Sequence, residues 1–415
     1  MRRNCLRVLF INQFYWPDAA ATSQLLTDVT RALTAEGHEV EVLCGKTGYA
    51  SVDIMDEPPP VAVQRIPCVP YLPGKIGRAL SYVSFLLGCL WGGLRSKKAD
   101  LIVTMTTPPL LSVVGAILQR KQRAKHYIWV MDLFPEALVD VGIFRADALA
   151  IRLFHFIIDW SYRKADGVIA LGECMRRRLA ERNIPEHKLH IAENWADGTE
   201  IFPINRERTG PLYITYSGNL GLSHDVDTIL YAIRALKDDN RFHFRFIGGG
   251  QGQKAAQDAC TAEGLRNVSF QAYCPRTRLA ESLSEIDIGL VTQRPASAGS
   301  VVPSKVYGLM AAGRPILYIG PRTTTPFWIV ERFRCGWQND CGDGPGLIAL
   351  LNELESHPER VAAAGANGRE AFLENYERSK GVARFCSLLG AGMRGGEVTP
   401  EMNVAVSSPE QALET

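Results

Sequence analysis

The sequence predicts an α/β fold in which two domains, each with a parallel sheet covered by helices, follow one another along the chain. Short apolar, β-branched runs alternate with helical patterns throughout, and such runs are typical of strands that are buried on both faces. A polar, turn-rich segment at 194–210 interrupts the alternation, which then restarts. The length of 415 residues is sufficient for two domains with sizeable cores.

Each element is expected from this alternation. In the first half, the expected strands are 6–12, 39–44, 62–66, 100–105, 126–131 and 167–171, and the expected helices are 22–36, 77–95, 108–120 and 148–163. In the second half, the expected strands are 212–217, 242–248, 268–272, 287–291 and 315–319, and two late helices are expected at 358–374 and 378–389. Gly37 ends the first helix, as a C-terminal glycine commonly does.

The domain boundaries follow from shifts in composition. We expect an amino-terminal domain over 1–197, a linker over 198–210, a carboxyl-terminal domain over 211–377 and a tail over 391–415. The tail is rich in glycine and polar residues, which predicts disorder. The helix at 378–390 is expected to pack back on the first domain.

The overall composition excludes several classes of protein. The net charge is only +2, which does not point to a polyanionic partner such as nucleic acid. The ten cysteines are scattered without a CxxC pair, and Cys335 and Cys341 are too isolated for a zinc site. Cys44 and Cys89 lie in apolar runs, where packed, reduced thiols are expected. These features fit a cytoplasmic protein.

Two apolar stretches could be mistaken for membrane segments. The run that follows Arg2 and Arg3 is short and leads directly into polar residues, so we interpret it as a first buried strand and not as a signal peptide. The segment 79–94 is too short to span a bilayer. Either it is a buried helix, or it lies on a membrane surface through side chains such as Leu86 and Leu90.

The loops after strands are the places to look for chemistry, because ligands of open parallel sheets bind at the carboxyl ends of the strands. Gly218 and Gly221 follow one strand, and His224 then precedes a helix. This is either a tight turn with a solvated histidine or a phosphate site. The glycine run at 248–252 loosely fits a dinucleotide fingerprint, but the next strand carries no acidic residue to hold a ribose, which argues against NAD.

The segment Ser297–Gly313 reads as a loop of small residues followed by a short helix. Pro303 stands where the first helical turn would begin. Small residues let a ligand approach the backbone, and a helix N-terminus attracts anions. Lys305 adds a full positive charge. The segment is therefore either an anion site or an ordinary surface turn before a buried helix.

The first domain offers fewer candidates. Asp132 and Glu136 follow a strand and could act as an acid, a base or helix N-caps. Ala20 and Ala21 lie in the first strand-to-helix loop and could border a substrate, while the aromatic residues of that loop could instead pack on the linker.

Several basic residues could neutralise a bound diphosphate. No Asp-x-Asp pair stands out as a site for a divalent metal, so the charge would fall to helix termini, Lys305 and either Arg276 or Arg294. The basic run at 176–178 is expected to be a solvated helix face. No GxSxG, P-loop or HExxH motif is present.

The motifs taken together resemble those of family 4-type retaining glycosyltransferases of the GT-B fold, which has two Rossmann-like domains. The resemblance is to the bacterial subgroup that builds capsule, O-antigen and colanic acid. The motifs that carry it, over most of residues 5–390, are GHEVEVL (37–43), DLFPE (132–136), AENWAD (192–197), YSGNLGLSHD (216–225), FIGGG (246–250), NVSFQAY (267–273) and VPSKVYGLMAAGRPIL (302–317).

This resemblance implies a donor and an acceptor on different domains, which face each other across a cleft. The donor would be a nucleotide-sugar, expected to be UDP-linked, on the second domain. The acceptor, a saccharide or a lipid-linked sugar, would bind the first domain through Ala20, Ala21, Asp132 and Glu136. The resemblance implies no cofactor and no metal requirement. It also implies a place at the inner face of the cytoplasmic membrane, to which the segment 79–94 would be suited.

The resemblance also assigns donor contacts position by position. Gly218 matches the glycine after the first strand of the donor domain. The arginine and lysine that often follow it are replaced here by Asn219 and His224. The second glycine loop matches Gly249 and Gly250, and the base-reading region matches Tyr273 and Cys274.

The chain departs from the family pattern in the segment Ser297–Gly313. Many members carry a Glu-x7-Glu motif there, and the equivalent positions are Ser300 and Gly308. The ribose contact would then pass to Ser304 or Lys305. The expected donor contacts in this segment are Ser300, Val301, Pro303, Ser304 and Lys305.

The resemblance implies front-side transfer with retention at the anomeric carbon. Lys305, His224 and the N–H groups of 300–304 are expected to support the leaving diphosphate, and Asp132 is expected on the acceptor side. Two alternatives remain at this point. One is a nucleotide-sugar epimerase, and the other is a non-catalytic nucleotide-binding protein, which the two missing glutamates favour.

Overall fold

The computed structural model describes residues 5–18, 20–46, 57–69, 74–206 and 208–393. Contacts within the chain separate two compact units. The first runs to Glu193 and also includes the described residues from Val382 to Met393, and the second runs from Asn194 to Gly381. Both units are α/β, so the predicted fold class of two parallel-sheet domains is confirmed.

The first unit is built on a seven-stranded sheet in the order β3-β2-β1-β4-β5-β6-β7. All its strand pairs are parallel. The strands are β1 (Arg7–Ile11), β2 (Glu39–Gly45), β3 (Ala62–Ile66), β4 (Leu101–Thr104), β5 (Lys125–Trp129), β6 (Gly167–Ala170) and β7 (Leu189–Ile191). The helices are α1 (Ala21–Ala35), α2 (Lys75–Arg95), α3 (Leu111–Gln122), α4 (Glu136–Val139), α5 (Leu149–Lys164), α6 (Glu173–Glu181) and most of α14 (Arg378–Met393).

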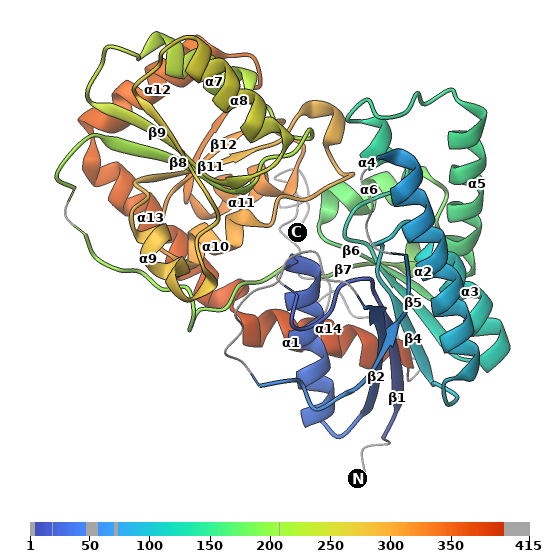
Figure 1. Ribbon diagram of the computed structural model, residues 1–415. Coiled ribbons are helices and arrows are strands. Elements are labelled where there is room, and N and C mark those ends of the chain that lie inside the picture. Colours follow the sequence, from blue (N-terminus) through green and yellow to red (C-terminus); the bar gives the residue numbers. More distant parts are fainter. Residues whose placement is uncertain (1–4, 19, 47–56, 70–73, 207, 394–415) are drawn as a thin grey trace. The chain divides into compact units, whose positions relative to one another are not determined.

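The core of the first unit lies between the sheet and helices on both faces (Figure 1). Leu9 and Ile11 on β1 pack in one cluster with Phe85 and Cys89 of α2. On α14, the Phe385 ring lies 4.1 Å from the ring of Trp129 on β5. The last described helix of the chain therefore completes the fold of the first unit.

The second unit has a six-stranded parallel sheet in the order β10-β9-β8-β11-β12-β13. The strands are β8 (Leu212–Asn219), β9 (Phe242–Gly249), β10 (Val268–Gln271), β11 (Ile288–Thr292), β12 (Ile316–Ile319) and β13 (Gly336–Asn339). The helices are α7 (Asp227–Ala235), α8 (Gln251–Ala262), α9 (Leu279–Ser284), α10 (Lys305–Ala311), α11 (Thr325–Phe333), α12 (Gly344–Ser356) and α13 (Pro358–Asn375).

The strand order marks one place on each sheet for a ligand. In the first sheet the chain starts at β1, builds outward to β3 and returns to β4 on the other side of β1. In the second sheet it does the same around β8 and β11. Such a reversal leaves an opening at the carboxyl ends of the two neighbouring strands, which is the usual ligand site of open α/β sheets.

The differences from the predicted elements are confined to edges and ends. The edge strands β7 and β13 were not predicted, because one has three residues and the other, GWQN, is largely polar. The helix expected from residue 108 begins at Leu111, after two prolines. The helix α14 continues to Met393, so the start of the predicted tail at residue 391 is wrong. The remainder of that tail lies outside the described residues.

The segment 79–94 belongs to the longer helix α2. Within the described part of the chain, no helix is long and apolar enough to cross a membrane.

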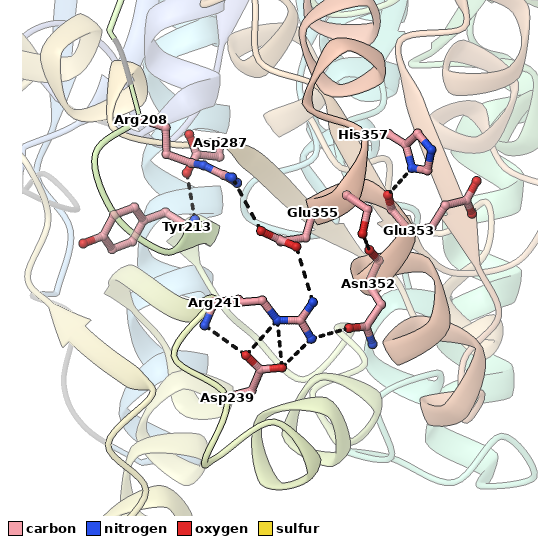
Figure 2. Close-up of polar contacts among 10 residues, drawn as sticks. Arg208, Tyr213, Asp239, Arg241, Asp287, Asn352, Glu353, Glu355 and His357 are labelled. Carbon is pink, nitrogen blue, oxygen red and sulfur yellow. Dashed lines mark hydrogen bonds and ion pairs between the residues drawn. The ribbon is translucent and has the colours of Figure 1, made fainter.

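The amino ends of the second sheet are tied to α12 by a polar network (Figure 2). The Arg241 guanidinium donates hydrogen bonds to Asp239 and, at 2.8 Å, to Asn352, and forms an ion pair of 3.3 Å with Glu355. Arg208 forms a second, longer ion pair with Glu355, of 3.7 Å. Because the Arg241 side chain is about half exposed, these ion pairs contribute little stability. Their position at the amino ends keeps them apart from the expected ligand site.

We expect Gly336→Ala to destabilise the second unit by about 1–3 kcal/mol, the usual cost of overpacking. A Cβ atom at Gly336 would lie 1.9 Å from the Ile316 carbonyl oxygen on β12, and a backbone atom cannot rotate away. Urea unfolding followed by circular dichroism measures the change. Gly210→Ala is the matched control, because nothing lies within 4 Å of its added Cβ. Equal stability of the two variants would contradict this account of the β12–β13 pairing.

Candidate active site

Two glycine loops meet at the carboxyl ends of β8 and β9. The pairing of these strands continues to Asn219 and Gly249. A Cβ at Gly248 would lie 2.3 Å from the Gly218 carbonyl oxygen, and a Cβ at Gly250 would lie 2.4 Å from the Leu220 carbonyl oxygen. Gly248 and Gly250 also have positive φ angles of 132° and 111°. Only glycine allows the two loops to pass this closely.

Lys305 reaches this junction from the start of α10. A Cβ at Gly218 would lie 2.6 Å from Lys305 Cε, so the lysine side chain runs against the glycine. Its Nζ atom lies 4.9 Å from the centre of the Tyr216 ring, within the range of a cation–π contact. Burial lowers the pKa of Lys305 to about 8. The ammonium group is therefore mostly charged at neutral pH and held beside both glycine loops.

His224 is held in place by hydrogen bonds. Its Nδ1 lies 2.6 Å from the Thr292 carbonyl oxygen, and its Nε2 lies 3.2 Å from the Tyr216 hydroxyl. Burial, and then the charge of Lys305, lowers the pKa of His224 to about 4. The ring is therefore neutral at neutral pH, and Nδ1–H donates to Thr292. Of the predicted polar or cationic contact of His224 with phosphate, the cationic form is wrong for neutral pH, and so is the alternative of a solvated residue.

Asn219 and Tyr273 border the same junction. A Cβ atom added at Gly250 would lie 2.5 Å from the Asn219 Oδ1 atom. The Tyr273 ring lies beside the second glycine loop, 3.1 Å from an added Cβ at Gly248 and 3.4 Å from one at Gly249. The Tyr273 side chain is 59% exposed, so its ring offers a flat surface to a ligand.

The structure thus brings together most of the predicted donor residues of the second unit, namely Gly218, Asn219, His224, Gly249, Gly250, Tyr273 and Lys305. Cys274 is turned away from this group, since its Sγ contacts the carbonyl oxygens of Pro275 and Arg278 at 3.5 Å.

The loop before α10 is closed on itself. The Ser300 N–H and the Val301 N–H both donate to the Ser297 carbonyl oxygen, and so does the Ser300 hydroxyl. Gln293 Nε2 donates to the carbonyl oxygens of Ser297 and Val301. The N–H groups of 300 and 301 are therefore already used, and the expectation that they support a diphosphate is wrong.

The start of α10 also differs from the prediction. The helix begins at Lys305, with Ser304 as its N-cap, so Pro303 lies before the helix and not in its first turn. Ser304 is exposed. Gly308 lies within α10, and an added Cβ there would meet only Ile201, at 4.0 Å. Packing around Gly308 therefore leaves room for a side chain, and glycine is not required there for steric reasons.

Asp132 is the one predicted acceptor-side residue with a free reactive group in the described structure. It follows β5, and its N–H donates to Thr106 Oγ1 at 3.2 Å. Its carboxylate makes no hydrogen bond or ion pair with any described residue, and burial alone raises its pKa to about 6. An unpaired carboxylate of this kind can accept a proton from a substrate near neutral pH.

The other acceptor-side candidates have structural roles. Glu136 forms an ion pair of 3.2 Å with Arg182, which also binds Asp159. It is not an N-cap, because Pro135 holds that position for α4, and Asp132 is not one either. Ala20 is the N-cap of α1, and its N–H donates to Asp18 at 2.8 Å, while Ala21 is the exposed first residue of that helix.

Tyr15, one of the aromatic residues of the first loop, does not pack on the linker. The Tyr15 hydroxyl is hydrogen-bonded to Thr30 Oγ1 of α1 at 2.8 Å, and the side chain is buried in the first unit.

The arginines are engaged by protein groups. Arg276 binds Glu200 through two hydrogen bonds of 2.8 and 3.0 Å, and Arg294 Nε donates to the His224 carbonyl oxygen at 3.0 Å. The run at 176–178 is not a plain solvated face, because Arg176 and Arg177 pair with Glu173 and Arg178 pairs with Asp140.

Two residues of the site were missed from sequence. Tyr216 lies within the expected strand 212–217, and the structure shows its hydroxyl donating to the Asn219 carbonyl oxygen at 2.8 Å beneath Lys305. Thr292 ends β11, and its Oγ1 donates to the Asp225 carbonyl oxygen at 3.0 Å. Their position near the carboxyl ends of two neighbouring central strands was the available signal.

No group of three or more His, Cys, Asp or Glu side chains within the described residues is arranged to hold a metal ion.

Comparisons with known proteins agree with this arrangement. A model of the glycosyl transferase 4-like domain matches residues 22–195, and a model of glycosyl transferases group 1 matches residues 197–371. WbjE of Pseudomonas aeruginosa, named a probable glycosyltransferase, is 28% identical over 71% of this chain and 75% of its own. WcaI of Escherichia coli K12, named for colanic acid biosynthesis, is 22% identical over 89% of this chain and 92% of its own.

Solved structures share the fold. Sucrose-phosphate synthase of Thermosynechococcus elongatus has a TM-score of 0.76 at 15% identity, over 94% of this chain and 100% of its own. HepE of Anabaena, solved with UDP-glucose, has a TM-score of 0.69 at 15% identity, over 93% and 100% of the two chains. With both family models matched in order along the chain, this protein belongs to the family 4-type glycosyltransferases of the GT-B fold.

Proposed function

We propose that this glycosyltransferase moves a sugar from a nucleotide-sugar, with retention at the anomeric carbon, to a saccharide or lipid-linked acceptor in the synthesis of a surface polysaccharide. The observation that carries the proposal is the enclosed ammonium of Lys305 beside two glycine loops at the carboxyl ends of β8 and β9. The name of WcaI, which mentions colanic acid biosynthesis, supports the pathway class, and the name of WbjE supports glycosyl transfer.

The proposed donor site is suited to a nucleoside diphosphate. Lys305 supplies the positive charge, and the glycines let the diphosphate approach the backbone of both loops. Tyr273 is placed to stack on the base. We favour a UDP-sugar, because HepE, with a similar fold, was solved with UDP-glucose. A hexose or an N-acetylhexosamine is the proposed sugar.

In the proposed reaction, the acceptor oxygen bonds to the anomeric carbon on the face from which the diphosphate leaves, and the acceptor proton passes to the protein or to the departing phosphate. The negative charge that develops on the diphosphate is stabilised by Lys305, without a metal ion. His224 acts through its neighbours, since its Nδ1–H is committed to Thr292 and its Nε2 lies 3.2 Å from the Tyr216 hydroxyl. Asp132 is the proposed acceptor-side carboxylate.

A panel of UDP-, GDP- and dTDP-sugars tests the proposal, with melting temperature and product analysis as the two measurements. One nucleotide should stabilise the fold by about 2.7 kcal/mol at a ligand excess of about 100 dissociation constants. Stabilisation without transfer to any acceptor would favour the non-catalytic alternative. An interconverted free nucleotide-sugar would favour the epimerase.

We expect Lys305→Ala to lower the turnover number by about 100-fold or more and to weaken nucleotide binding, because the charge that faces the diphosphate is lost. Steady-state kinetics with the donor found in the panel measure the effect. Lys237→Ala removes an exposed lysine of the same unit and should leave turnover unchanged. Wild-type turnover in Lys305→Ala would remove this residue from the site.

Nucleotide affinity should fall as pH rises above about 8, by up to about tenfold per pH unit, because Lys305 then loses its proton in the free enzyme. The terminal phosphate is already ionised there, since its second pKa is about 6. Calorimetry with UDP from pH 7 to 10 measures the slope and the proton taken up near pH 8. Lys305→Ala should bind weakly with a flat profile, and the same slope in both proteins would refute the assignment.

The acceptor kcat/KM should fall below about pH 6 in the unmutated enzyme, because Asp132 must be ionised to accept a proton. Asp132→Asn should lose at least about 100-fold in kcat/KM, lose this inflection and keep the donor affinity. Glu136→Gln is the control, since Glu136 is paired with Arg182, and it should keep the inflection. Unchanged kinetics in Asp132→Asn would exclude it from the acceptor site.

A further inference from the structure

The helix α2 has an apolar face on each side. Phe85 and Cys89 are fully buried against the sheet, and Leu86 and Leu90 pack partly on the same core. The opposite side carries a stripe of exposed large apolar side chains at helical spacing, which are Leu80, Val83, Leu87, Trp91 and Leu94. The lipid-facing choice of Leu86 and Leu90 made from sequence is therefore wrong, because those two side chains face the core.

The helix α5 carries a second stripe of the same kind. Its exposed side chains are Leu149, Leu153, Phe156 and Trp160, spaced by four, three and four residues. Leu149 is 80% exposed and Phe156 is 66% exposed. Such side chains are normally buried, so a continuous stripe of them marks an interaction surface.

The two stripes belong to one layer. The helix α3 contacts both α2 and α5, and Figure 1 shows the three helices on the same side of the first sheet. Gly93 of α2 packs against Leu118 of α3, and Ser112 of α3 is hydrogen-bonded to Ser161 of α5 at 2.7 Å. Ile117, which is 41% exposed, lies on α3 between them.

The charged side chains of these three helices are mostly positive. In sequence, α2 carries three Lys or Arg residues, α3 two and α5 three. Asp159 of α5 is the single acidic residue of these helices, and it is already bound by Arg182. Several cations lie at the helix ends. Arg95 ends α2 and Arg163 lies in the last turn of α5, and the exposed Lys97 and Lys98 follow α2.

We propose that the outer face of α2, α3 and α5 lies on an anionic lipid surface, with the two apolar stripes inserted at the boundary of the acyl chains and the flanking cations on the headgroups. An apolar face framed by Lys and Arg and carrying Trp is the pattern of an interfacial helix. Arg95 lies 4.1 Å from the centre of the Trp91 ring, which suits a cation and an aromatic ring at headgroup level.

The charges of this face favour an anionic lipid surface over a second copy of this chain as its binding partner. Two such faces brought together would oppose cations with cations, because the one carboxylate is internally paired. Anionic headgroups instead complement the cations of the layer. This inference stands on the first unit alone and does not depend on the donor or on the chemistry of transfer.

Co-sedimentation of the full chain with vesicles of phosphatidylglycerol and phosphatidylcholine tests the proposal. The unmutated chain should bind, and binding should weaken with pure phosphatidylcholine and with added salt. Leu87→Asp with Trp91→Asp, and separately Leu153→Asp with Phe156→Asp, should each weaken binding by at least about tenfold. Arg120→Glu with Lys121→Glu should weaken binding only to the anionic vesicles.

The matched control is Leu373→Asp, which changes an exposed leucine (45%) on α13 of the second unit and should bind as the unmutated chain does. In a second measurement, brominated lipids should quench tryptophan fluorescence, and Trp91→Phe with Trp160→Phe should remove most of the quenching. Absence of vesicle binding, or binding unaffected by both pairs of aspartates, would overturn the proposal. A dimer in solution that Leu87→Asp dissociates would assign the face to a second copy and also overturn it.

Discussion

The close passage of the loops after β8 and β9 is the constraint on which the candidate site depends. The Gly218 carbonyl lies where a side chain at Gly248 would be, and Lys305 lies where a side chain at Gly218 would be. Two groups thus occupy space left free by missing Cβ atoms. The ammonium of Lys305 comes to the strand ends through this space, and its burial there is the cause of its lowered pKa.

The neutral state of His224 follows from the same enclosure. A second cation at this position would add repulsion to the desolvation that Lys305 already bears, and the charge of Lys305 does contribute to lowering the pKa of His224. A neutral ring avoids that cost. Its Nδ1–H donates to the Thr292 carbonyl at the end of β11, and its Nε2 lies 3.2 Å from the Tyr216 hydroxyl on β8. A neutral histidine at this position therefore fixes the geometry beside Lys305 without adding a second charge.

The sequence predicted the strands of both sheets well, because buried parallel strands are continuous apolar runs. It also indicated the strand ends at which the candidate site lies, since topology decides where such an opening forms. It failed where the outcome depends on hydrogen bonds between distant residues. The N–H groups of Ser300 and Val301 donate to the Ser297 carbonyl oxygen, which the sequence does not indicate. Glu136 and Asp132 look equivalent in sequence, but Glu136 forms an ion pair with Arg182. Only the folded structure separates these cases.

The helix α2 shows the same limit for surfaces. Its sequence is apolar nearly all round, so periodicity alone could not decide which leucines face the core. The sheet decides it, because α2 lies against β2 and β3 and turns Phe85 and Cys89 inward. The other face of the first sheet carries α1 and α14, and Phe385 of α14 seals it against Trp129. One face of the unit is thus closed by the last described helix of the chain, and the apolar stripes remain only on the face whose cations suit a lipid surface.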